Sequence, residues 1–479
     1  MTPPRDGRAI LCADIGTSSL KAALVDFEGR LRAFVREGYA DGEGRSVTGA
    51  DWETAFRRAS LRLSRDARED GMDLAAVCVS GNGPSLVPVT ADGADLPPLH
   101  WHDGRTSPLA AADPSARPKS FFLPRAAWLK EHDGASYARV RRFLSCHEWL
   151  SSRLGADEVG VLPSPAYGPY FWDAAQIAAY GLDADLFPPL VNMGTRIGSV
   201  SRAAARDFDL PEGLPIVAAG TDYFMALVGV GVIEKGMVCD RAGTSEGINV
   251  CAEKPARTAD LLTLPQLKAE LWHVSAMLPT TGRLFEWFRT ITGQTDRGYA
   301  DMLREITAAA PRAFDGSARG KDGSGGFFFP DVRSAGSLTA SSAFISTAGL
   351  TTRAELGRAV VEAIGFMVRE AIGTLERHGF RIDAMRLSGG QAKNEVWNRL
   401  KADMTGRCLA VPEVPDGELI GNACAALVAL GEARTVEEAV ARTVRIERVY
   451  ESDQRAYAVH SERYDAWRAM RAKMEKFFE

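Results

Sequence analysis

The stretch Ala13-Asp14-Ile15-Gly16-Thr17-Ser18-Ser19 leads from an apolar strand into a Gly-Thr-Ser turn, and Arg241-Ala242-Gly243-Thr244-Ser245-Glu246-Gly247 repeats this pattern. Thr17 and Thr244 are 227 positions apart (244 minus 17), so each turn lies in a different half of the chain. The backbone N–H groups and hydroxyls of such a turn suit a phosphate group. We therefore expect two phosphate-binding turns, with one nucleotide held between two lobes.

The residues around the first turn predict a β-hairpin. The apolar runs Ala9–Ala13 and Lys21–Val25 flank the turn, and a second turn follows at residues 26–30. A hairpin differs from the strand-loop-helix of Rossmann and Walker nucleotide sites. The further elements that we expect are a helix at 51–66, strands at 74–80, 86–90 and 216–222, a helix at 223–230, a helix from about 356 to 378, a strand at 384–387 and a helix at 394–404.

Composition is that of an ordinary folded protein with two large domains. The chain has 479 residues, of which 46% are hydrophobic and 25% charged. We place the lobes at residues 1–250 and 251–479. The formal net charge of −5 argues against a nucleic-acid partner, because such proteins normally carry a basic excess.

Seven scattered cysteines without Cys-x-x-Cys spacing indicate reduced thiols, several of them in apolar runs, and hence a cytoplasmic protein. The first residues lack the apolar segment of a secretion signal, and no stretch approaches the roughly 18 apolar residues of a membrane span. The seven histidines show no paired spacing typical of a metal site. We therefore expect no membrane association, and we consider a homodimer as the assembly.

Asp14 lies at the end of a predicted buried strand, directly before the first turn. A carboxylate next to a phosphate site is favourable when Mg²⁺ lies between them. The alternative is that Asp14 only accepts hydrogen bonds from the amides of the turn.

Asp222 lies at the end of the predicted buried strand 216–222, as Asp14 does at the end of its own strand. Small residues follow Asp222. An aspartate that orients a hydroxyl and accepts its proton is typical of phosphoryl transfer to an alcohol. Capping of the helix that begins at Tyr223 is the structural alternative.

Two further segments are candidates for ligand contacts. Gly389 and Gly390 precede a helix and would let an adenine or a phosphate approach the backbone, although a Gly-Gly pair is usually only a tight turn. Trp101, Asp103 and Arg105 alternate, so in an extended segment they would project to one side and bind a sugar by stacking and charged hydrogen bonds. An Asp–Arg pair that only braces a loop is the alternative.

Taken in order, these segments resemble the FGGY family of carbohydrate kinases over nearly the whole chain. The matching segments are residues 14–21, 79–82, 101–106, 219–222, 243–245, 349–350, 358–362, 388–394 with Trp397 and 402–403, and 418–423. Within the family, the sequence resembles the xylulokinase-like branch most, mainly through Trp101-His102-Asp103-Gly104-Arg105-Thr106.

The resemblance implies an α/β fold with two actin-like, ribonuclease-H-like ATPase lobes and an interdomain cleft that holds ATP, Mg²⁺ and the sugar. It implies that Asp222 is the catalytic base and that Asp14 faces the metal through water. The residues that match nucleotide-binding positions are Asp14, Gly16, Thr17, Ser18, Lys21, Gly243, Thr244, Ser245, Gly389, Gly390 and Asn394. The residues that match the sugar side are Asn82, Trp101, Asp103, Arg105, Asp222 and Tyr223.

The implied reaction is transfer of the γ-phosphoryl group of ATP to a hydroxyl of a small sugar, with a ketopentose such as D-xylulose as the first candidate. The chain departs from xylulokinases at Asn82-Gly83-Pro84-Ser85, where they show Gln-Met-His-Gly, and glycerol kinases show an Arg-Glu pair. Kinases of another ketose or polyol, of the erythritol, ribulose or glycerol type, therefore stay open. So do two functions of a different kind, namely an actin-like ATPase that moves a protein partner and a sugar sensor without activity.

Overall fold

The computed structural model describes residues 7–39, 46–92, 96–106, 119–243, 245–278, 281–308, 326–330, 342–346 and 352–478. Contacts divide the chain into two compact units. Unit 1 comprises Met1–Ile233, Leu264–Leu271 and Asp416–Arg445, and unit 2 comprises Glu234–Thr263, Trp272–Pro415 and Ile446–Glu479. The predicted lobes, 1–250 and 251–479, stay a prediction. Residues 416–445 belong to unit 1 again, which the sequence did not lead us to expect.

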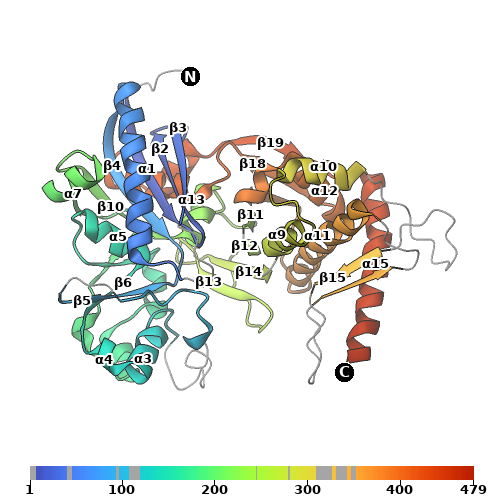
Figure 1. The fold of residues 1–479 in the computed structure, drawn as a ribbon, viewed down its shortest axis with the longest axis horizontal. Coiled ribbons are helices and arrows are strands. Elements are labelled where there is room, and N and C mark those ends of the chain that lie inside the picture. Colours follow the sequence, from blue (N-terminus) through green and yellow to red (C-terminus); the bar gives the residue numbers. More distant parts are fainter. Residues whose placement is uncertain are drawn as a thin grey trace. The chain divides into compact units, whose positions relative to one another are not determined.

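Unit 1 is built on a six-stranded sheet with the order β3-β2-β1-β4-β10-β9 (Figure 1). Its strands are β1 (Arg8–Ile15), β2 (Ser19–Asp26), β3 (Leu31–Gly38), β4 (Asp73–Gly81), β9 (Arg196–Ser199) and β10 (Pro215–Thr221). Strands β1, β2 and β3 form an antiparallel meander, β4 and β10 run parallel to β1, and β9 is antiparallel to β10. The predicted hairpin around the first Gly-Thr-Ser turn is therefore confirmed.

The two faces of β1 contact different helices, because successive side chains of a strand point to opposite sides. Leu11 and Ala13 belong to the apolar core that includes Trp52 and Phe56 of α1 (Gly49–Glu69). On the other face lies α13 (Gly417–Ala429), whose Asn422 Nδ2 donates at 3.1 Å to Ser80 Oγ, the hydrogen-bond partner of Asp14. Asp14 shares this second face and so points toward α13.

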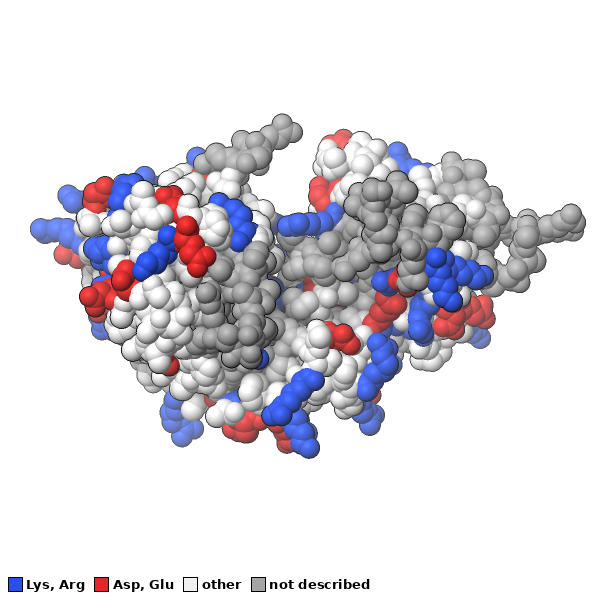
Figure 2. Space-filling model, turned by 90° about the horizontal axis from the view of Figure 1, so that it is seen from below, with Lys and Arg blue, Asp and Glu red and all other residues white. Residues whose placement is uncertain are grey.

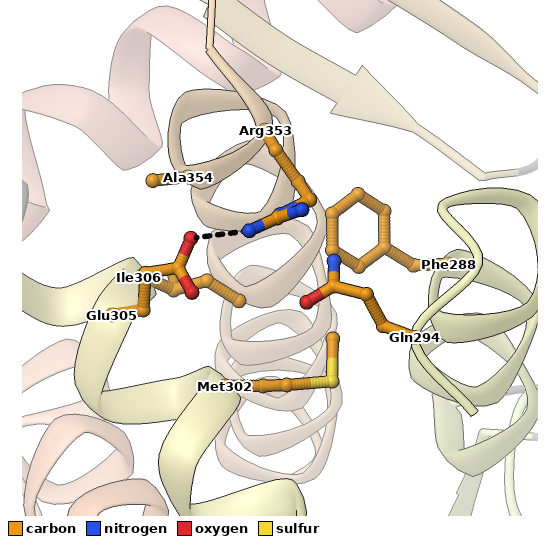
Figure 3. Close-up of a pocket in the computed structure, with 7 residues that line it drawn as sticks. All are labelled: Phe288, Gln294, Met302, Glu305, Ile306, Arg353 and Ala354. Atoms are coloured by element: carbon orange, nitrogen blue, oxygen red, sulfur yellow. Dashed lines mark hydrogen bonds and ion pairs between the residues drawn. The ribbon is translucent and has the colours of Figure 1, made fainter. Parts of the chain in front are cut away.

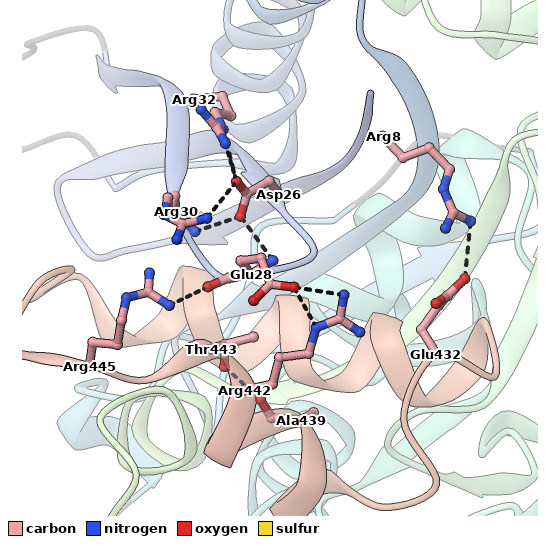
Figure 4. Close-up of polar contacts among 10 residues, drawn as sticks. All are labelled: Arg8, Asp26, Glu28, Arg30, Arg32, Glu432, Ala439, Arg442, Thr443 and Arg445. Atoms are coloured by element: carbon pink, nitrogen blue, oxygen red, sulfur yellow. Dashed lines mark hydrogen bonds and ion pairs between the residues drawn. The ribbon is translucent and has the colours of Figure 1, made fainter. Parts of the chain in front are cut away.

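The segment 416–445 is attached to the first strands by polar contacts around the turn after β2 (Figure 4). Arg442 of α14 (Val436–Thr443) pairs with Glu28 at 3.0 Å, and Arg445 Nη1 donates to the Glu28 carbonyl oxygen at 2.6 Å. Gly29 has φ +78°, and a Cβ there would lie 2.5 Å from the Thr443 carbonyl oxygen, so this close approach needs glycine. These contacts hold α13 against β1.

The other described elements of unit 1 surround this sheet. They are β5 (Leu86–Thr90), β6 (Val140–Ser145), β7 (Gly160–Leu162), β8 (Leu190–Asn192), α3 (Leu123–His132), α4 (Gly134–Tyr137), α5 (Cys146–Leu154), α6 (Ala174–Ala179), α7 (Arg202–Phe208), α8 (Asp222–Gly229) and the 3₁₀ turns Gly104–Thr106, Pro165–Tyr170 and Ala184–Leu186. Strands β5 and β6 pair antiparallel, and β7 and β8 pair parallel.

Unit 2 contains a seven-stranded sheet with the order β13-β14-β12-β11-β17-β18-β19 (Figure 1). Its strands are β11 (Val238–Ala242), β12 (Glu246–Ala252), β13 (Leu262–Pro265), β14 (Trp272–Leu278), β17 (Ala384–Ser388), β18 (Cys408–Pro412) and β19 (Ile446–Tyr450). Strands β11, β12 and β14 form an antiparallel meander, β17 and β18 run parallel to β11, and β19 is antiparallel to β18. Six strands of unit 2 therefore repeat the directions of the six strands of unit 1.

The helix predicted near 356–378 is α11 (Arg353–Arg377), and its ends follow from local chemistry. Thr352 Oγ1 accepts from the Glu355 N–H at 3.2 Å, and Glu355 Oε2 accepts from the Thr352 N–H at 2.9 Å, which is a capping box. Gly379, at φ +86°, follows its last turn. The other elements of unit 2 are α9 (Thr281–Ile291), α10 (Tyr299–Ala308), β15 (Gly326–Phe329), β16 (Ala343–Ser346), the 3₁₀ turn Gly390–Lys393, α12 (Glu395–Thr405) and α15 (Gln454–Phe478).

Charged side chains of both signs are mixed on the face that Figure 2 draws. The seven cysteines are all free thiols, and all except Cys408 are buried. Among the described residues, no helix is both long and apolar enough to cross a membrane. The absence of a nucleic-acid partner and the homodimer stay predictions.

Candidate functional site

Three predicted site residues of unit 1 lie at one edge of its sheet. Strands β1, β4 and β10 are parallel, and the register pairs Ile15 with Gly81 and Gly81 with Thr221. The residues that follow these strands, Gly16, Asn82 and Asp222, therefore lie at the same edge. Ligands of open α/β sheets bind outside the carboxyl ends of parallel strands.

Asp14 is the buried acid of this edge, with 2% of its surface exposed. Ser80 Oγ donates to Asp14 Oδ1 at 2.8 Å. The pKa of Asp14 is raised to about 7, mainly by burial and also by the charges of Glu418 and Asp222, against the lowering effects of Lys21 and Ser80. Asp14, Asp222, Glu418 and Lys21 thus form one electrostatic group.

Lys21 is the cation of this group, and it lies directly opposite Asp14 in the β1–β2 register. Its Nζ is 3.2 Å from Asp416 Oδ1 and 3.6 Å from Glu418 Oε2. Burial alone would lower the pKa of Lys21, but Glu418, Asp416 and Asp14 outweigh it and raise the pKa. Asp416 and Glu418 were not among the predicted site residues, although Glu418 begins the family-like segment 418–423 and Asp416 directly precedes α13.

The first Gly-Thr-Ser turn is closed by a hydrogen bond of its own backbone. The Gly16 N–H donates to the Ser19 carbonyl oxygen at 3.1 Å, and a Cβ at Gly16 would lie 2.8 Å from that oxygen. Thr17 is partly exposed and Ser18 is exposed. This turn is a hairpin turn that only glycine closes without a clash.

Asn82 holds the first turn, and its predicted contact with the sugar stays a prediction. It is 3% exposed, and its Nδ2 donates to the carbonyl oxygens of Ile15 and Gly16, each at 3.1 Å. Its Oδ1 accepts from Ser85 Oγ at 2.6 Å, and Ser85 Oγ accepts from the Trp101 N–H at 3.2 Å. The departure of this chain at residues 82–85 therefore builds a hydrogen-bonded connection between the first Gly-Thr-Ser turn and Trp101.

Trp101, Asp103 and Arg105 do not lie on an extended segment, and that expectation is wrong. The Asp103 N–H donates to the His100 carbonyl oxygen at 3.0 Å, which makes a turn, and Gly104–Thr106 is a 3₁₀ turn. Arg105 Nε lies 2.9 Å from Asp103 Oδ1, and the guanidinium lies 4.6 Å from the centre of the Trp128 ring. The Asp–Arg pair braces this turn, and the hydrogen bonds of Arg105 to Asp103 lower the pKa of that carboxyl.

Trp101 contacts the first Gly-Thr-Ser turn directly. Its Nε1 donates to Thr17 Oγ1 at 3.3 Å, and its carbonyl oxygen accepts from Arg125 Nη2 at 3.0 Å. The structure therefore brings Trp101 and Thr17 together, although the sequence assigned them to different ligands.

Asp222 is the first residue of α8, and Thr221 is the N-cap residue. Asp222 Oδ1 accepts from the Tyr223 N–H at 2.6 Å, so the side chain does bond to the first turn of α8, as the capping alternative requires in part. Close helix packing fixes the position of α8, because a Cβ at Gly421 of α13 would lie 2.2 Å from the Met225 carbonyl oxygen. Asp222 and Tyr223 are both partly exposed.

In unit 2, the structure brings the second turn next to the predicted glycine pair. Strands β11 and β17 are parallel, with Arg241 opposite Ser388. Gly389 has φ +92°, and a Cβ there would lie 2.4 Å from the Ala242 carbonyl oxygen, whereas a Cβ at Gly390 would meet no atom within 4 Å. The Gly243 N–H donates to the Ser245 carbonyl oxygen at 2.9 Å, and Thr244 lies outside the described residues, as do 349–350.

Asn394 is the N-cap residue of α12. Its Oδ1 accepts from the Trp397 N–H at 3.0 Å, so this side chain has a structural partner. Its predicted contact with the nucleotide stays a prediction.

A buried ion triad lies beside the second turn. Lys401 of α12 binds Asp240 of β11 and Glu246 of β12, each at 2.6 Å, and all three are essentially inaccessible. Burial raises the pKa of Glu246 above its usual value, to about 8, and the lowering effect of Lys401 does not reverse this. The triad connects the two strands that flank the turn to α12.

A search for a metal site and for a pocket among the described residues adds no residue to the candidate site. No group of three or more His, Cys, Asp and Glu in this part of the chain has the arrangement to hold a metal ion. A shallow pocket of unit 2 lies between α9, α10 and α11, and an Arg353–Glu305 ion pair of 3.2 Å spans it (Figure 3). It contains none of the predicted site residues.

Comparison with known proteins assigns the family. The sequence model of the FGGY family of carbohydrate kinases, N-terminal domain, matches residues 119–229, and that of the C-terminal domain matches residues 241–430. Together the two ranges cover more than half of the chain. The chain belongs to the FGGY family of carbohydrate kinases.

The relatives of this FGGY kinase have different substrates in their names. A xylulose kinase of Staphylococcus epidermidis is 22% identical over 488 residues, with 96% of each chain covered. An autoinducer-2 kinase of Salmonella choleraesuis is 23% identical over 512 residues, with 98% of this chain and 95% of that protein covered. At this identity the family is shared and the substrate is not fixed.

The crystal structure of a xylulose kinase from Brucella ovis superposes with a TM-score of 0.78 at 20% identity, over 98% of this chain and 100% of that one. The fold of this FGGY kinase is therefore that of its family, with two actin-like ATPase lobes, and the predicted fold class is confirmed. The roles of the individual site residues stay predictions.

Proposed function

We propose that this FGGY kinase transfers the γ-phosphoryl group of ATP to a hydroxyl of a small, uncharged ketose or polyol, with D-xylulose as the first candidate. One observation carries the proposal: Asp14, Lys21, Asp222 and Glu418 gather at the edge of the sheet where the first Gly-Thr-Ser turn lies. A phosphate-binding turn beside a partly exposed carboxylate is what phosphoryl transfer to an alcohol requires.

Asp222 is the proposed catalytic base. Its hydrogen bond with the Tyr223 N–H fixes the carboxylate at the start of α8, where the residue is partly exposed and can meet the acceptor hydroxyl. As the hydroxyl oxygen bonds to the γ-phosphorus and the bond to ADP breaks, the hydroxyl proton passes to Asp222. The positive end of α8 stabilises the carboxylate before it takes the proton.

Asp14 fits a site next to a hydrated Mg²⁺. Two other carboxylates raise its pKa, so a divalent cation nearby would relieve their repulsion. The lack of a ready group of three ligands among the described residues agrees with an ion held mainly by water and phosphate oxygens. Bound Mg²⁺ would supply charge neutralisation on the phosphates.

For the nucleotide we propose Gly16, Thr17, Ser18 and Lys21 in unit 1. In unit 2 we propose Gly243, Thr244 and Ser245 together with Gly389, Gly390 and Asn394. Open space at Gly390 and the exposed backbone at Gly243 support close approach of a ligand.

On the sugar side we propose Trp101, Asp103, Arg105 and Tyr223 as contact residues. We propose a positioning role for Asn82, since its amide binds the backbone of the phosphate turn. The free, mostly buried cysteines support a cytoplasmic location.

The experiment is a coupled ADP-release assay with MgATP over D-xylulose, D-ribulose, D-fructose, erythritol, xylitol and glycerol. We expect ADP release that depends on one of these compounds, with the phosphorylated product identified by mass spectrometry. ADP release that no compound stimulates would overturn the proposal and favour an ATPase with another partner.

A further inference from the structure

Tyr167 carries a buried hydroxyl without a hydrogen-bond partner among the described residues. It lies in the 3₁₀ turn Pro165–Tyr170, and 3% of its surface is exposed. Buried polar groups are nearly always paired, and an unpaired one costs free energy. The hydroxyl therefore needs an explanation that the fold alone does not supply.

The surroundings of Tyr167 connect it to the proposed catalytic residue. Its ring meets the ring of Phe224 edge-on, with centroids 5.8 Å apart, and Phe224 is two residues after Asp222. The Tyr170 ring lies 6.0 Å away and stacks on Phe121 at 5.2 Å. The turn 165–170 therefore packs against the start of α8.

Three phenol groups gather at this position. Burial raises the pKa of Tyr167. The Tyr170 ring lies 6.0 Å from it, and Tyr223 directly precedes Phe224, whose ring contacts Tyr167. Tyr170 and Tyr223 are partly exposed, unlike Tyr167. The cluster thus has a side that solvent reaches and a hydroxyl at its buried end.

We propose that Tyr167 determines substrate specificity: its hydroxyl binds an uncharged hydroxyl or carbonyl oxygen of the acceptor, beyond the hydroxyl that faces Asp222. This inference rests on the proposed kinase function. Tyr167, Tyr170 and Tyr223 are neutral donors and acceptors, and Phe121 and Phe224 add apolar ring surface. None of the five residues carries a positive charge, so the cluster suits the neutral end of a ketose or polyol and disfavours the carboxylate of a sugar acid.

The test uses Tyr167→Phe, which removes only the hydroxyl, and Tyr137→Phe as the matched control. Tyr137 is also buried, but its hydroxyl donates to Asp183 Oδ2 at 3.0 Å and accepts from the Asp183 N–H at 3.2 Å. Without ligand, we expect the melting temperature to be unchanged or raised in Tyr167→Phe and lowered in Tyr137→Phe.

Binding is then measured as the shift in melting temperature with D-xylulose, D-ribulose, D-fructose, erythritol, xylitol, glycerol and gluconate, which needs no turnover. We expect at least one neutral compound to stabilise the wild type and Tyr137→Phe, to bind Tyr167→Phe about tenfold more weakly, and gluconate to stabilise none of them. For a compound that is phosphorylated, KM rises in Tyr167→Phe while KM for ATP is unchanged.

The inference is overturned if Tyr167→Phe loses stability as Tyr137→Phe does, if the neutral compounds bind wild type and Tyr167→Phe alike, or if gluconate alone binds. It is also overturned if no compound stabilises the wild type. Binding that depends on Tyr167 without phosphoryl transfer would remove the proposed function and leave this assignment intact.

Discussion

In unit 1 the Gly-Thr-Ser turn lies next to Asp14, Asp222, Asp416 and Glu418, and Lys21 pairs with the last two, whereas in unit 2 Lys401 binds both carboxylates that flank the turn, at 2.6 Å each. The strands that lead into the two turns have the same directions and neighbours. The difference is therefore electrostatic. Unit 1 holds several carboxylates around one cation, a repulsion that a cationic ligand would relieve, and unit 2 pairs both carboxylates that flank its turn with Lys401.

The largest effect on folding should come from the cation of unit 2. Lys401→Met leaves Asp240 and Glu246 buried without their partner, and such changes cost about 3–5 kcal/mol. We expect a large drop in melting temperature. Lys21→Met is the matched variant, and because Lys21 is partly exposed we expect a smaller drop and a raised KM for ATP. Equal losses of stability would contradict the comparison.

The largest effect on turnover should come from the carboxylate of unit 1. Asp222→Asn keeps the hydrogen bond with the Tyr223 N–H but removes the base, so we expect kcat to fall roughly a thousandfold or more with ATP affinity nearly unchanged. Asp173→Asn is the control, since Asp173 accepts from the Gln176 N–H at the start of α6 and lies outside the proposed site. If both variants lose activity only through stability, Asp222 is a helix cap.

Gly389 and Gly390 test the nucleotide site that we propose in unit 2. Gly389→Ala introduces a Cβ 2.4 Å from the Ala242 carbonyl oxygen at a positive φ, so we expect a loss of stability of about 1–3 kcal/mol and weaker nucleotide binding. Gly390→Ala meets no atom within 4 Å and should leave stability unchanged. A fluorescent ATP analogue and thermal melting measure the two effects. Nucleotide binding that is unaltered in both variants would remove this turn from the nucleotide site.

The repulsion among the carboxylates of unit 1 has a pH dependence with a defined sign. The pKa of Asp14 is higher in the folded than in the unfolded protein, so between about pH 4 and pH 7 the folded state binds more protons. Ligand-free stability should therefore fall as pH rises through this window, by about 4 kcal/mol at most for a shift of this size. Asp14→Asn should flatten that part of the profile, as thermal melting from pH 4 to pH 8 would show.

Local sequence predicted the fold well where one strand or helix explains its own pattern. The hairpin around Gly16, the strand before Asp222 and the periodic helix α11 all follow from apolar spacing and turn residues. The prediction of an extended segment from Trp101 to Arg105 was wrong, because alternation of side chains does not distinguish a strand from a turn closed by an Asp–Arg pair.

The roles of the predicted site residues stay predictions, and the contacts of the proposed site that come from distant segments were not predicted. Asp416 and Glu418 reach Lys21 only because residues 416–445 return to unit 1. The hydrogen bonds of Asn82 to Ile15 and Gly16, some 66 residues away in sequence, were likewise not predicted, and its contact with the sugar stays a prediction. Such pairings depend on tertiary contacts that a single sequence does not contain.

The most direct test of the difference between the two units is the melting temperature of the wild type and Asp14→Asn at pH 8, each without ligand and with MgATP. Asp14→Asn retains an oxygen that accepts from Ser80 and removes one buried negative charge. We predict that it melts at a higher temperature than the wild type without ligand, and that MgATP stabilises the wild type more. A ligand-free Asp14→Asn protein that melts below the wild type would contradict the account.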